Sequence, residues 1–250
     1  MKALVTGASS GIGRDIALYL DSLGYKLILV GRNYEALEEV RSTCRIAKVI
    51  TCDLSKLEEV YRLYNEVKRE KITLLVNNAG FGLFGDFNKT DLEIELEMIA
   101  VNITAVHILT KLFLRDFTKN KKGQILNVAS AAGFMAGPGL NTYYATKNYV
   151  LKLTLGIYEE LRRQKSNIKI SCLCPGPVDT NFQDRAGGEF KGNDLSSEYV
   201  AKYAVDKMLK NKLIIVPSFR MKIGLFLTRI IPIKLHLKIV YNIQKKRDKY

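Results

Sequence analysis

The sequence is poor in the features that divide or cross-link a chain. Its 250 residues include five prolines and four cysteines, and contain no internal repeat, Pro-rich linker or low-complexity stretch. Cys172 and Cys174 form a C-x-C pair without the second pair that a zinc finger needs, so ordinary buried thiols are favoured over a metal site. No secretory signal precedes the first apolar run. These absences, with a hydrophobic fraction of 47%, predict one globular, cytoplasmic domain.

The charge balance is unusual. Lysine and arginine number 39 against 25 acids, a formal net charge of +14. Residues 217–250 hold nine bases and one acid, a net +8, so more than half of the excess lies in the tail. This segment is also rich in apolar residues and carries no recognisable nucleic-acid-binding motif, so we expect no nucleic-acid partner.

Apolar runs of strand length alternate with segments of helical period. Strands are predicted near 2–6, 26–30, 46–52, 72–76, 123–129, 168–174 and 212–216, and helices near 11–23, 34–43, 56–70, 91–118, 142–164 and 196–210. The strands are continuous apolar runs, as expected when both faces of a parallel sheet are covered. We predict one doubly wound α/β (Rossmann) domain over residues 1–216, with a mostly parallel seven-stranded sheet, followed by a basic, apolar appendage over residues 217–250.

A glycine-rich segment, TGASSGIG at 6–13, lies between the first predicted strand and the first helix. Gly7 permits a tight turn, whereas Gly11 and Gly13 let the backbone and the helix approach a pyrophosphate, which the helix N-terminus favours. A tight turn that binds nothing is the alternative. The position between a strand and a helix favours a dinucleotide site.

Two residues bear on the adenosine end of such a site. The second strand ends at Gly31 and Arg32, where an acid would bind the ribose hydroxyls; here a guanidinium is offered to a 2′-phosphate instead. NADP(H) is therefore predicted over NAD(H), unless Arg32 is only a solvated surface charge. Asp53 is placed to accept a hydrogen bond from an adenine amino group or, alternatively, to cap the helix near Lys56.

Tyr143 and Lys147 are four residues apart in a predicted helix and so lie on one face of it. An ammonium beside a phenol favours the phenolate, which would bring the tyrosine pKa down toward neutrality. Ser130, at the end of the fifth strand, could hold the same carbonyl oxygen. A Tyr/Lys pair with this spacing is more often a pair of surface side chains. The combination of Tyr143, Lys147 and Ser130 at the carboxyl edge of a sheet favours proton transfer to a carbonyl instead.

These segments together resemble the short-chain dehydrogenase/reductase family, in its branch of about 250 residues. The matching motifs are TGASSGIG at 6–13, NNAG at 77–80, Asn102 in VNITA, Ser130 in NVAS, YYATK at 143–147 and PGPVDT at 175–180. One departure is Ser10, where many NADP-preferring relatives carry a basic residue. The choice of cofactor therefore depends on Arg32.

The resemblance implies a role for each matching position. Tyr143 would be the general acid in reduction and the base in oxidation, Lys147 would bind the nicotinamide ribose, and Ser130 would orient the carbonyl. Asn102 would kink its helix and help hold a water of the proton relay. The implied cofactor-binding positions are Gly7, Ser9, Ser10, Gly11, Ile12, Gly13, Arg32, Asp53, Leu54, Asn77, Ala79, Gly80, Tyr143, Lys147, Pro175, Gly176, Val178 and Thr180.

The predicted activity is NADP(H)-dependent interconversion of a carbonyl and an alcohol on a small molecule; the alternative is a non-catalytic NADP-binding sensor or scaffold of the same fold. An apolar substrate is favoured by candidate wall residues. Residues 181–195, rich in glycine, would cover it as a lid or form a plain surface loop. A homodimer or homotetramer is implied by the resemblance. The candidate wall residues are Phe81, Phe84, Phe134, Met135, Leu140 and Phe182.

The tail has two apolar runs, 221–231 and 233–243, separated by Pro232. Neither is long enough to span a bilayer. Lys234 and Lys238 can share one polar face of a helix, a pattern typical of an amphipathic helix that rests on anionic lipid or lines a substrate entrance. Packing on the domain or on a neighbouring subunit is the alternative. We therefore predict a cytoplasmic protein with possible peripheral contact to a membrane.

Overall fold

The structure is a computed structural model that describes residues 1–180, 195–228 and 230–245. Its centre is a seven-stranded sheet in the order β3-β2-β1-β4-β5-β6-β9, with every neighbouring pair parallel. This confirms the predicted fold class. The strands of this sheet are β1 (Lys2–Thr6), β2 (Lys26–Gly31), β3 (Ala47–Thr51), β4 (Leu74–Asn77), β5 (Gln124–Val128), β6 (Lys169–Leu173) and β9 (Ile214–Ile215).

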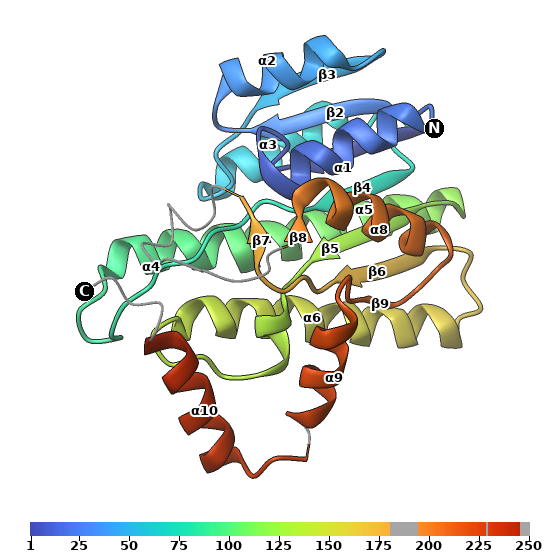
Figure 1. The fold of residues 1–250 in the computed structure, drawn as a ribbon. Helices are drawn as coiled ribbons and strands as arrows, with labels where there is room; N and C mark the ends of the chain where they lie inside the picture. Colours follow the sequence, from blue (N-terminus) through green and yellow to red (C-terminus); the bar gives the residue numbers. More distant parts are fainter. Residues whose placement is uncertain (181–194, 229, 246–250) are drawn as a thin grey trace.

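Helices connect the strands and cover both faces of the sheet (Figure 1). The helices before the tail are α1 (Gly11–Ser22), α2 (Tyr34–Thr43), α3 (Leu57–Val67), α4 (Leu92–Ile99), α5 (Val106–Asn120), α6 (Asn141–Arg163) and α8 (Ser197–Leu209). Side chains of α1, α2 and α8 form one buried cluster with one face of β1 and β2. Those of α3, α5 and the end of α6 form another cluster with the opposite face. Successive side chains of a strand alternate between the faces, which is why Val5 belongs to the first cluster and Leu4 to the second.

The sheet reverses its winding between β1 and β4, since β2 and β3 lie on one side of β1 while β4, β5, β6 and β9 lie on the other. Loops that leave the carboxyl ends of β1 and β4 therefore diverge to opposite faces of the sheet. The crevice between such loops is where open α/β sheets bind their ligands. The fold thus places the predicted glycine loop beside this crevice.

The long helix predicted over 91–118 is interrupted. Ala100–Ala105 forms a π-helical turn, η1, between α4 and α5. Leu92–Asn120 as a whole is long and apolar enough to cross a membrane. However, Leu109, Phe113 and Phe117 lie in the core beneath the sheet, so its apolar character is that of a core helix.

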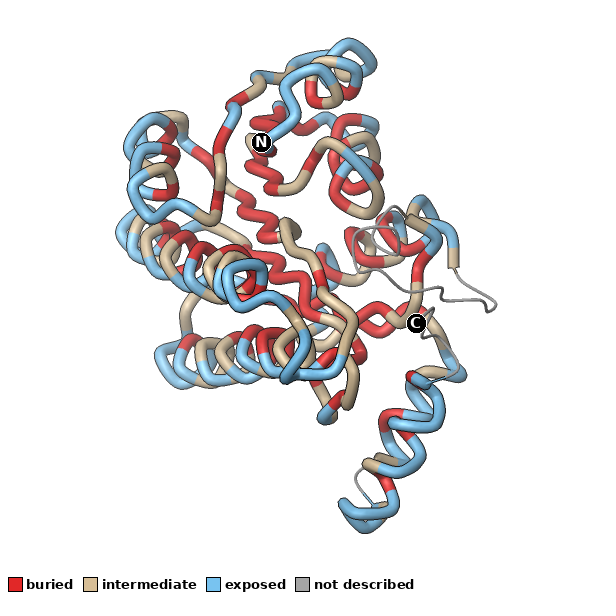
Figure 2. Tube along the Cα trace, turned by 90° about the vertical axis from the view of Figure 1, so that its left-hand side faces the viewer, coloured by how far each residue is buried: buried red, intermediate tan, exposed pale blue. Residues whose placement is uncertain are grey.

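Two features were not predicted as elements. A short parallel pair, β7 (Val178–Asp179) and β8 (Leu195–Ser196), stands apart from the main sheet, and a 3-10 turn, η2 (Ala131–Phe134), follows β5. The tail forms two helices, α9 (Phe219–Leu227) and α10 (Ile233–Lys245), which we call the arm. The arm projects from the body of the domain (Figure 1), and most of α10 is exposed (Figure 2).

Candidate active site

A cavity of about 550 Å³ lies at the carboxyl edge of the sheet. Its walls come from the loop after β1, the ends of β2 and β3, the loop after β4, Val101 of η1, the segment from β5 into α6, and the residues after β6. The arm supplies a further wall. The predicted site residues on these walls are Gly7, Ser9, Ser10, Gly11, Ile12, Arg32, Asp53, Leu54, Ala79, Gly80, Ser130, Tyr143, Lys147, Pro175, Gly176, Val178 and Thr180.

The glycine loop is shaped by close approaches that no side chain would allow. Gly7 and Gly11 have φ of +64° and +53°, a region that favours glycine. A Cβ on Gly13 would lie 2.2 Å from the carbonyl oxygen of Gly7. Gly13 does not itself line the cavity; it lets α1 pack against the loop. The resulting cradle of backbone at the start of a helix fits a dinucleotide pyrophosphate.

The loop after β4 is fastened to the glycine loop. Asn78 Nδ2 donates to the carbonyl oxygens of Thr6 (3.0 Å) and Gly7 (3.2 Å). In return, Thr6 Oγ1 accepts from the backbone N–H groups of Asn78 (3.0 Å) and Ala79 (3.1 Å). Thr6 and Asn78 lie inside the TGASSGIG and NNAG motifs but were not among the predicted site residues. They fix the relative position of the two loops.

At the adenosine end, Arg32 lines the cavity and its Nη1 lies 2.7 Å from Glu97 Oε1. Both side chains are partly exposed, which makes this a weak ion pair that an anionic ligand can replace. Asp53 does not cap α3, because the N-cap is Lys56; the capping alternative is therefore wrong. Its carboxylate accepts hydrogen bonds from the N–H and hydroxyl of Ser55, at 3.1 and 2.7 Å.

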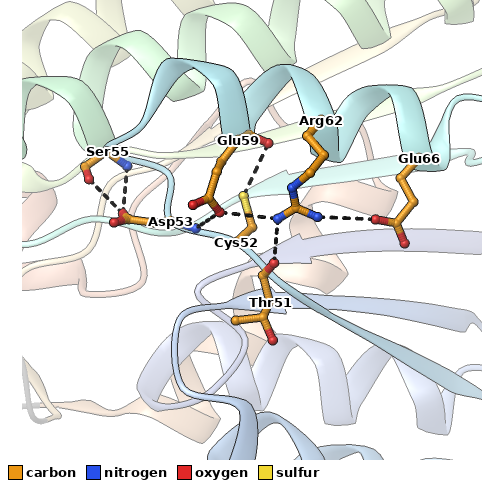
Figure 3. A network of polar contacts seen from close by, with 7 residues as sticks. All are labelled: Thr51, Cys52, Asp53, Ser55, Glu59, Arg62 and Glu66. Carbon is orange, nitrogen blue, oxygen red and sulfur yellow. Dashed lines mark hydrogen bonds and ion pairs between the residues drawn. The ribbon is translucent and has the colours of Figure 1, made fainter.

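A polar network beneath Asp53 holds this loop in place (Figure 3). Glu59 Oε2 accepts from the backbone N–H of Asp53 at 2.8 Å, and Arg62 Nη2 donates to the carbonyl oxygen of Thr51 at 2.9 Å. Burial raises the pKa of Asp53, but hydrogen bonds from Ser55 and the charge of Arg32 outweigh it and hold that pKa below its usual range. Asp53 is thus an ionised acceptor. Sequence spacing gave no signal for Glu59 and Arg62.

The predicted catalytic side chains meet in the same cavity. Ser130 follows β5 and starts η2, and its Oγ accepts from Ala132 N at 3.1 Å. Tyr143 and Lys147 stand one turn apart on α6, with Lys147 Nζ 5.7 Å from the centre of the Tyr143 ring. Nζ also donates to the carbonyl oxygen of Val128 at 3.1 Å, which fixes the ammonium at the end of β5. Serine, phenol and ammonium therefore face one space.

The electrostatics correct one expectation. Burial raises the pKa of Tyr143 to about 12, although a hydrogen bond with Ser130 lowers it. Burial also lowers the pKa of Lys147 to about 8. The predicted lowering of the Tyr143 pKa by the ammonium is therefore wrong for this structure, because burial raises that pKa by more than the hydrogen bond with Ser130 lowers it. At neutral pH Tyr143 holds its proton, and the geometry presents a proton donor.

Asn102 and Asn77 do not line the cavity. Asn102 lies in the π-helical turn, in agreement with the implied kink; its Nδ2 donates to Phe81 O (2.9 Å) and its Oδ1 accepts from Phe81 N (3.1 Å). It thus holds the loop after β4. Asn77 is part of a buried chain of side chains, in which its Nδ2 donates to Asn127 Oδ1 at 2.9 Å and Asn127 Nδ2 donates to Thr154 Oγ1 at 3.0 Å. In this structure both asparagines hold backbone or side chains in place through hydrogen bonds, and the role of Asn102 at a water of the proton relay stays a prediction.

The apolar wall only partly matches its prediction. Phe81, Met135 and Leu140 line the cavity, whereas Phe84 and Phe134 do not. Phe134 packs instead against a buried cluster that includes Val150 and Leu151. Phe182 and residues 181–194 of the predicted lid lie outside the described residues.

The arm contributes Met221, Val240, Ile243 and Gln244 to the wall. Met221 approaches Gly176 so closely that a Cβ there would lie 2.6 Å from its Cε. Gln244 Nε2 donates to the hydroxyl of Tyr144 at 2.6 Å. Of the alternatives for the tail, the structure shows packing on the domain, with the described part of the arm lining the cavity. Tyr144, the residue after Tyr143, also lines this wall.

Comparison with known proteins bears on this arrangement. A family model described as short chain dehydrogenase matches residues 1–189. Estradiol 17-beta-dehydrogenase 11 of Mus musculus is 34% identical over 254 residues, covering 98% of this chain and 84% of that protein. Epidermal retinol dehydrogenase 2 of Mus musculus is 32% identical over 249 residues, covering 92% and 78%.

Solved structures give the same result. A short-chain dehydrogenase from Sphingobium yanoikuyae in complex with NADPH is similar with a TM-score of 0.82 and 27% identity, over 87% of this chain and 88% of that one. The bulky-bulky ketone specific alcohol dehydrogenase from Comamonas testosteroni is similar with a TM-score of 0.79 and 25% identity, over 91% of each chain. This chain is therefore similar to these proteins in both sequence and fold.

Proposed function

The chain belongs to the short-chain dehydrogenase family and is an oxidoreductase, and from that premise we propose that it is NADP(H)-dependent and interconverts an apolar carbonyl compound and its alcohol. One observation carries the proposal: Ser130, Tyr143 and Lys147 face a single cavity that is also lined by the glycine loop. The nicotinamide cofactor would be held by that loop, Asp53 and Lys147, and it supplies or accepts the hydride.

In this proposal Ser130, Tyr143 and Lys147 each have a separate role in moving the proton. Ser130 Oγ donates to the carbonyl oxygen and holds it beside the phenol. Tyr143 transfers its proton to that oxygen in reduction and takes it back in oxidation. Lys147, held by Val128 O, places a positive charge near the oxygen on which negative charge develops. The largely apolar walls keep water from the reacting atoms.

Tyr143→Phe tests the activity. We expect kcat to fall by about 10²–10⁴-fold, the usual contribution of a positioned general acid, while NADPH still binds with similar affinity. The assay follows nicotinamide absorbance over a panel of ketones, sterols, acyl thioesters and sugars. If NADPH binds and no carbonyl is turned over by the wild type, the protein is instead a nucleotide sensor or scaffold. Undiminished turnover by the variant would contradict the assignment of Tyr143.

The preference for NADP(H) is supported by Arg32, which lines the cavity where no carboxylate follows β2. The similar Sphingobium yanoikuyae structure holds NADPH. We expect Arg32→Ala to raise KM for NADPH about tenfold and to leave KM for NADH within about twofold, since one charged hydrogen bond to the 2′-phosphate is lost. Arg45→Ala, which removes an ion-paired arginine outside the cavity, is the control. Equal effects on both cofactors would refute the assignment.

An apolar, bulky substrate is supported by the wall residues Met135, Leu140, Met221, Val240 and Ile243. The names of similar proteins include an estradiol dehydrogenase, a retinol dehydrogenase and a bulky-bulky ketone specific alcohol dehydrogenase. We expect kcat/KM to rise with the apolar size of the ketone. Turnover confined to small polar carbonyls would exclude this substrate class.

Peripheral contact of a cytoplasmic protein with anionic lipid is the proposal for the arm. Leu235, Ile239 and Ile243 form an exposed apolar stripe at i, i+4 and i+8 on α10. Lys234 and Lys238 form an exposed basic stripe beside it. A helix with an apolar face flanked by lysines matches the interface between acyl chains and anionic headgroups.

Flotation with phosphatidylserine liposomes tests this contact. We expect binding that weakens with salt and is lost when Lys234 and Lys238 are both changed to Glu. The matched control changes Lys210 and Lys212, exposed residues outside the arm, to Glu. If both double variants lose flotation equally, the effect is one of net charge and the arm is not the contact.

A homo-oligomer is proposed from exposed apolar residues on two helices that pack together. Leu92 and Leu96 are exposed at i and i+4 on one side of α4, and Tyr149 is exposed on α6. Exposed apolar side chains that gather on one side mark a protein interface. Sedimentation equilibrium should give a dimer or tetramer, and Leu96→Asp should shift it toward the monomer. A wild-type monomer would refute this proposal.

A further inference from the structure

The arm places one polar group in an otherwise apolar wall. Of the four lining residues that the described arm contributes, Met221, Val240, Ile243 and Gln244, only Gln244 is polar. It is 2% exposed. Its Nε2 donates to the Tyr144 hydroxyl, but its Oε1 is buried without a hydrogen-bond partner among the described residues.

A buried amide oxygen without a donor is costly, and a ligand that supplies the donor recovers that cost. No described neighbour in the domain or the arm supplies it, and the other described lining residues of the arm are hydrocarbon or thioether. A site with an unpaired polar atom in an apolar setting discriminates strongly for a ligand that completes it. Gln244 therefore has the properties of a specificity determinant.

The position of Gln244 defines which part of a substrate it would meet. Tyr143 and Tyr144 are adjacent on α6, so their side chains leave the helix about 100° apart. Their rings are 6.1 Å apart and nearly perpendicular, at 77°. In the proposed function Tyr143 contacts the reacting carbonyl, whereas the hydroxyl of Tyr144 accepts the hydrogen bond from Gln244. The amide therefore addresses a different portion of the substrate from the carbonyl.

Tyr144 is itself held where it can present this amide. A Cβ on Gly137 would lie 2.4 Å from the Tyr144 ring, so the ring lies directly on the backbone before α6. On the other side, α10 turns His236, Val240 and Gln244 inward at i, i+4 and i+8. The fixed phenol of Tyr144 and the buried side of α10 thus determine the position of the Gln244 carboxamide.

We propose that Gln244, positioned by Tyr144, binds a second polar group of the substrate, a hydroxyl separated from the reacting carbonyl by an apolar body. This rests on the proposed carbonyl–alcohol activity and names its substrate class: hydroxylated, bulky, apolar ketones and the corresponding diols. A hydroxyl both donates and accepts, so it pairs with the Oε1 acceptor and can also accept from neighbouring donors.

The test compares two probes that differ by one hydroxyl: a saturated tetracyclic monoketone and the same ketone with a hydroxyl at its opposite end. We expect the wild type to favour the hydroxyketone about 10- to 100-fold in kcat/KM, the factor expected for one buried hydrogen bond to a matched partner. Gln244→Leu keeps a similar apolar volume. It should raise KM for the hydroxyketone about tenfold, leave kcat within about twofold, and leave the monoketone unaffected.

Two further variants separate recognition from damage to the arm. Tyr144→Phe keeps the ring but removes the hydroxyl that holds the amide, so it should lose part of the preference for the hydroxyketone. Ile239→Ala, on the outward stripe of α10, should leave the preference intact. Thermal unfolding of each variant shows whether the fold is kept.

The outcomes are distinguishable. If the wild type reduces both ketones with no preference, or if Gln244→Leu weakens both alike, the role of Gln244 is refuted while the proposed function stands. If the wild type reduces neither, the wider panel of carbonyl compounds decides the proposed function, and calorimetric titration of both probes into the NADPH-loaded protein still decides the role of Gln244. Binding of the hydroxyketone that is tighter, and weakened by Gln244→Leu, supports it; equal binding overturns it.

Discussion

The two walls of the cavity are built in different ways. The sheet wall consists of the loops at 6–13 and 77–80 with Ser130, Tyr143 and Lys147. It is held together by buried and part-buried hydrogen bonds and by glycines that leave no room for a side chain. The arm wall contacts the domain through side chains such as Met221, Leu225 and Gln244, and much of its surface is exposed (Figure 2). On the proposals above, the sheet wall would carry the chemistry, and the arm wall would select the substrate and could vary with little effect on the fold.

Among substitutions in the two walls, we expect the largest effect from Gly13→Ala in the sheet wall. The new Cβ would meet backbone 2.2 Å away in the sheet wall, so we expect a loss of about 3 kcal/mol in the free energy of unfolding and no measurable binding of NADPH. Urea unfolding and cofactor titration measure the two effects. Gly156→Ala on α6, where no atom lies within 4 Å of the added Cβ, is the control, with an expected gain of about 0.5–1 kcal/mol. Normal NADPH binding by Gly13→Ala would show that the glycine loop can shift to accept the added Cβ without losing the cofactor site.

A second variant separates stability from activity within the sheet wall. Lys147 is 4% exposed, and burial lowers its pKa to about 8 from an ordinary 10.5. The folded protein therefore holds this proton less tightly than the unfolded chain does. The contribution of Lys147 to stability is lowest below about pH 8 and recovers as the pH rises toward 10.5.

Lys147→Met should accordingly abolish turnover and yet raise the free energy of unfolding at pH 7 by about 1–3 kcal/mol. Urea unfolding at several pH values measures this, and the difference from the wild type should shrink as the solution becomes alkaline. Destabilisation by Lys147→Met at pH 7 would mean that the bond to Val128 O is worth more than the burial of the charge.

The sequence allowed much of the sheet wall to be predicted and little of the arm wall. Strand and helix positions follow from apolar periodicity, and the glycine and YxxxK spacings act over a few residues, so Gly7, Tyr143 and Lys147 were identified. Glu59 supports Asp53, and Gln244 meets Tyr144 one hundred residues away in the chain. Contacts of that kind depend on tertiary packing and leave no periodic signal.

The phenol pKa shows the same limit. Spacing placed the ammonium correctly beside Tyr143, but the sign of the shift depends on how far both groups are desolvated. Burial is a property of the folded wall and cannot be read from two residues four apart.

The pH dependence of the reaction sharpens this point. Tyr143, with a pKa of about 12, keeps its proton over the working range, whereas Lys147 loses its charge above about pH 8. We expect kcat/KM for reduction to be flat below about pH 8 and to fall above it, since kcat/KM reports the groups of the free enzyme. Alcohol oxidation, which needs the phenol to act as a base, should instead be fastest in alkaline solution. A Lys147→Arg variant stays charged, so any activity that it retains should lack the inflection; an unchanged inflection would assign it to another group.

The smallest effect is expected from the arm. Gly224→Ala lies on α9, where nothing lies within 4 Å of the added Cβ. It is thus the same kind of substitution as Gly13→Ala in a looser setting. We expect kcat and KM to change by less than about twofold and the melting temperature to stay the same or rise slightly. A large loss of activity would show that α9 packs as tightly as the sheet wall.

The buried amides of Asn77 and Asn127 also fix the register between β4 and β5. They lie directly opposite each other in the sheet and are joined by a 2.9 Å hydrogen bond. A slip of the two strands by one residue would turn these amides against hydrocarbon and leave them unpaired. The alignment that brings the loop at 77–80 level with Ser130 is therefore selected during folding, before any ligand is present.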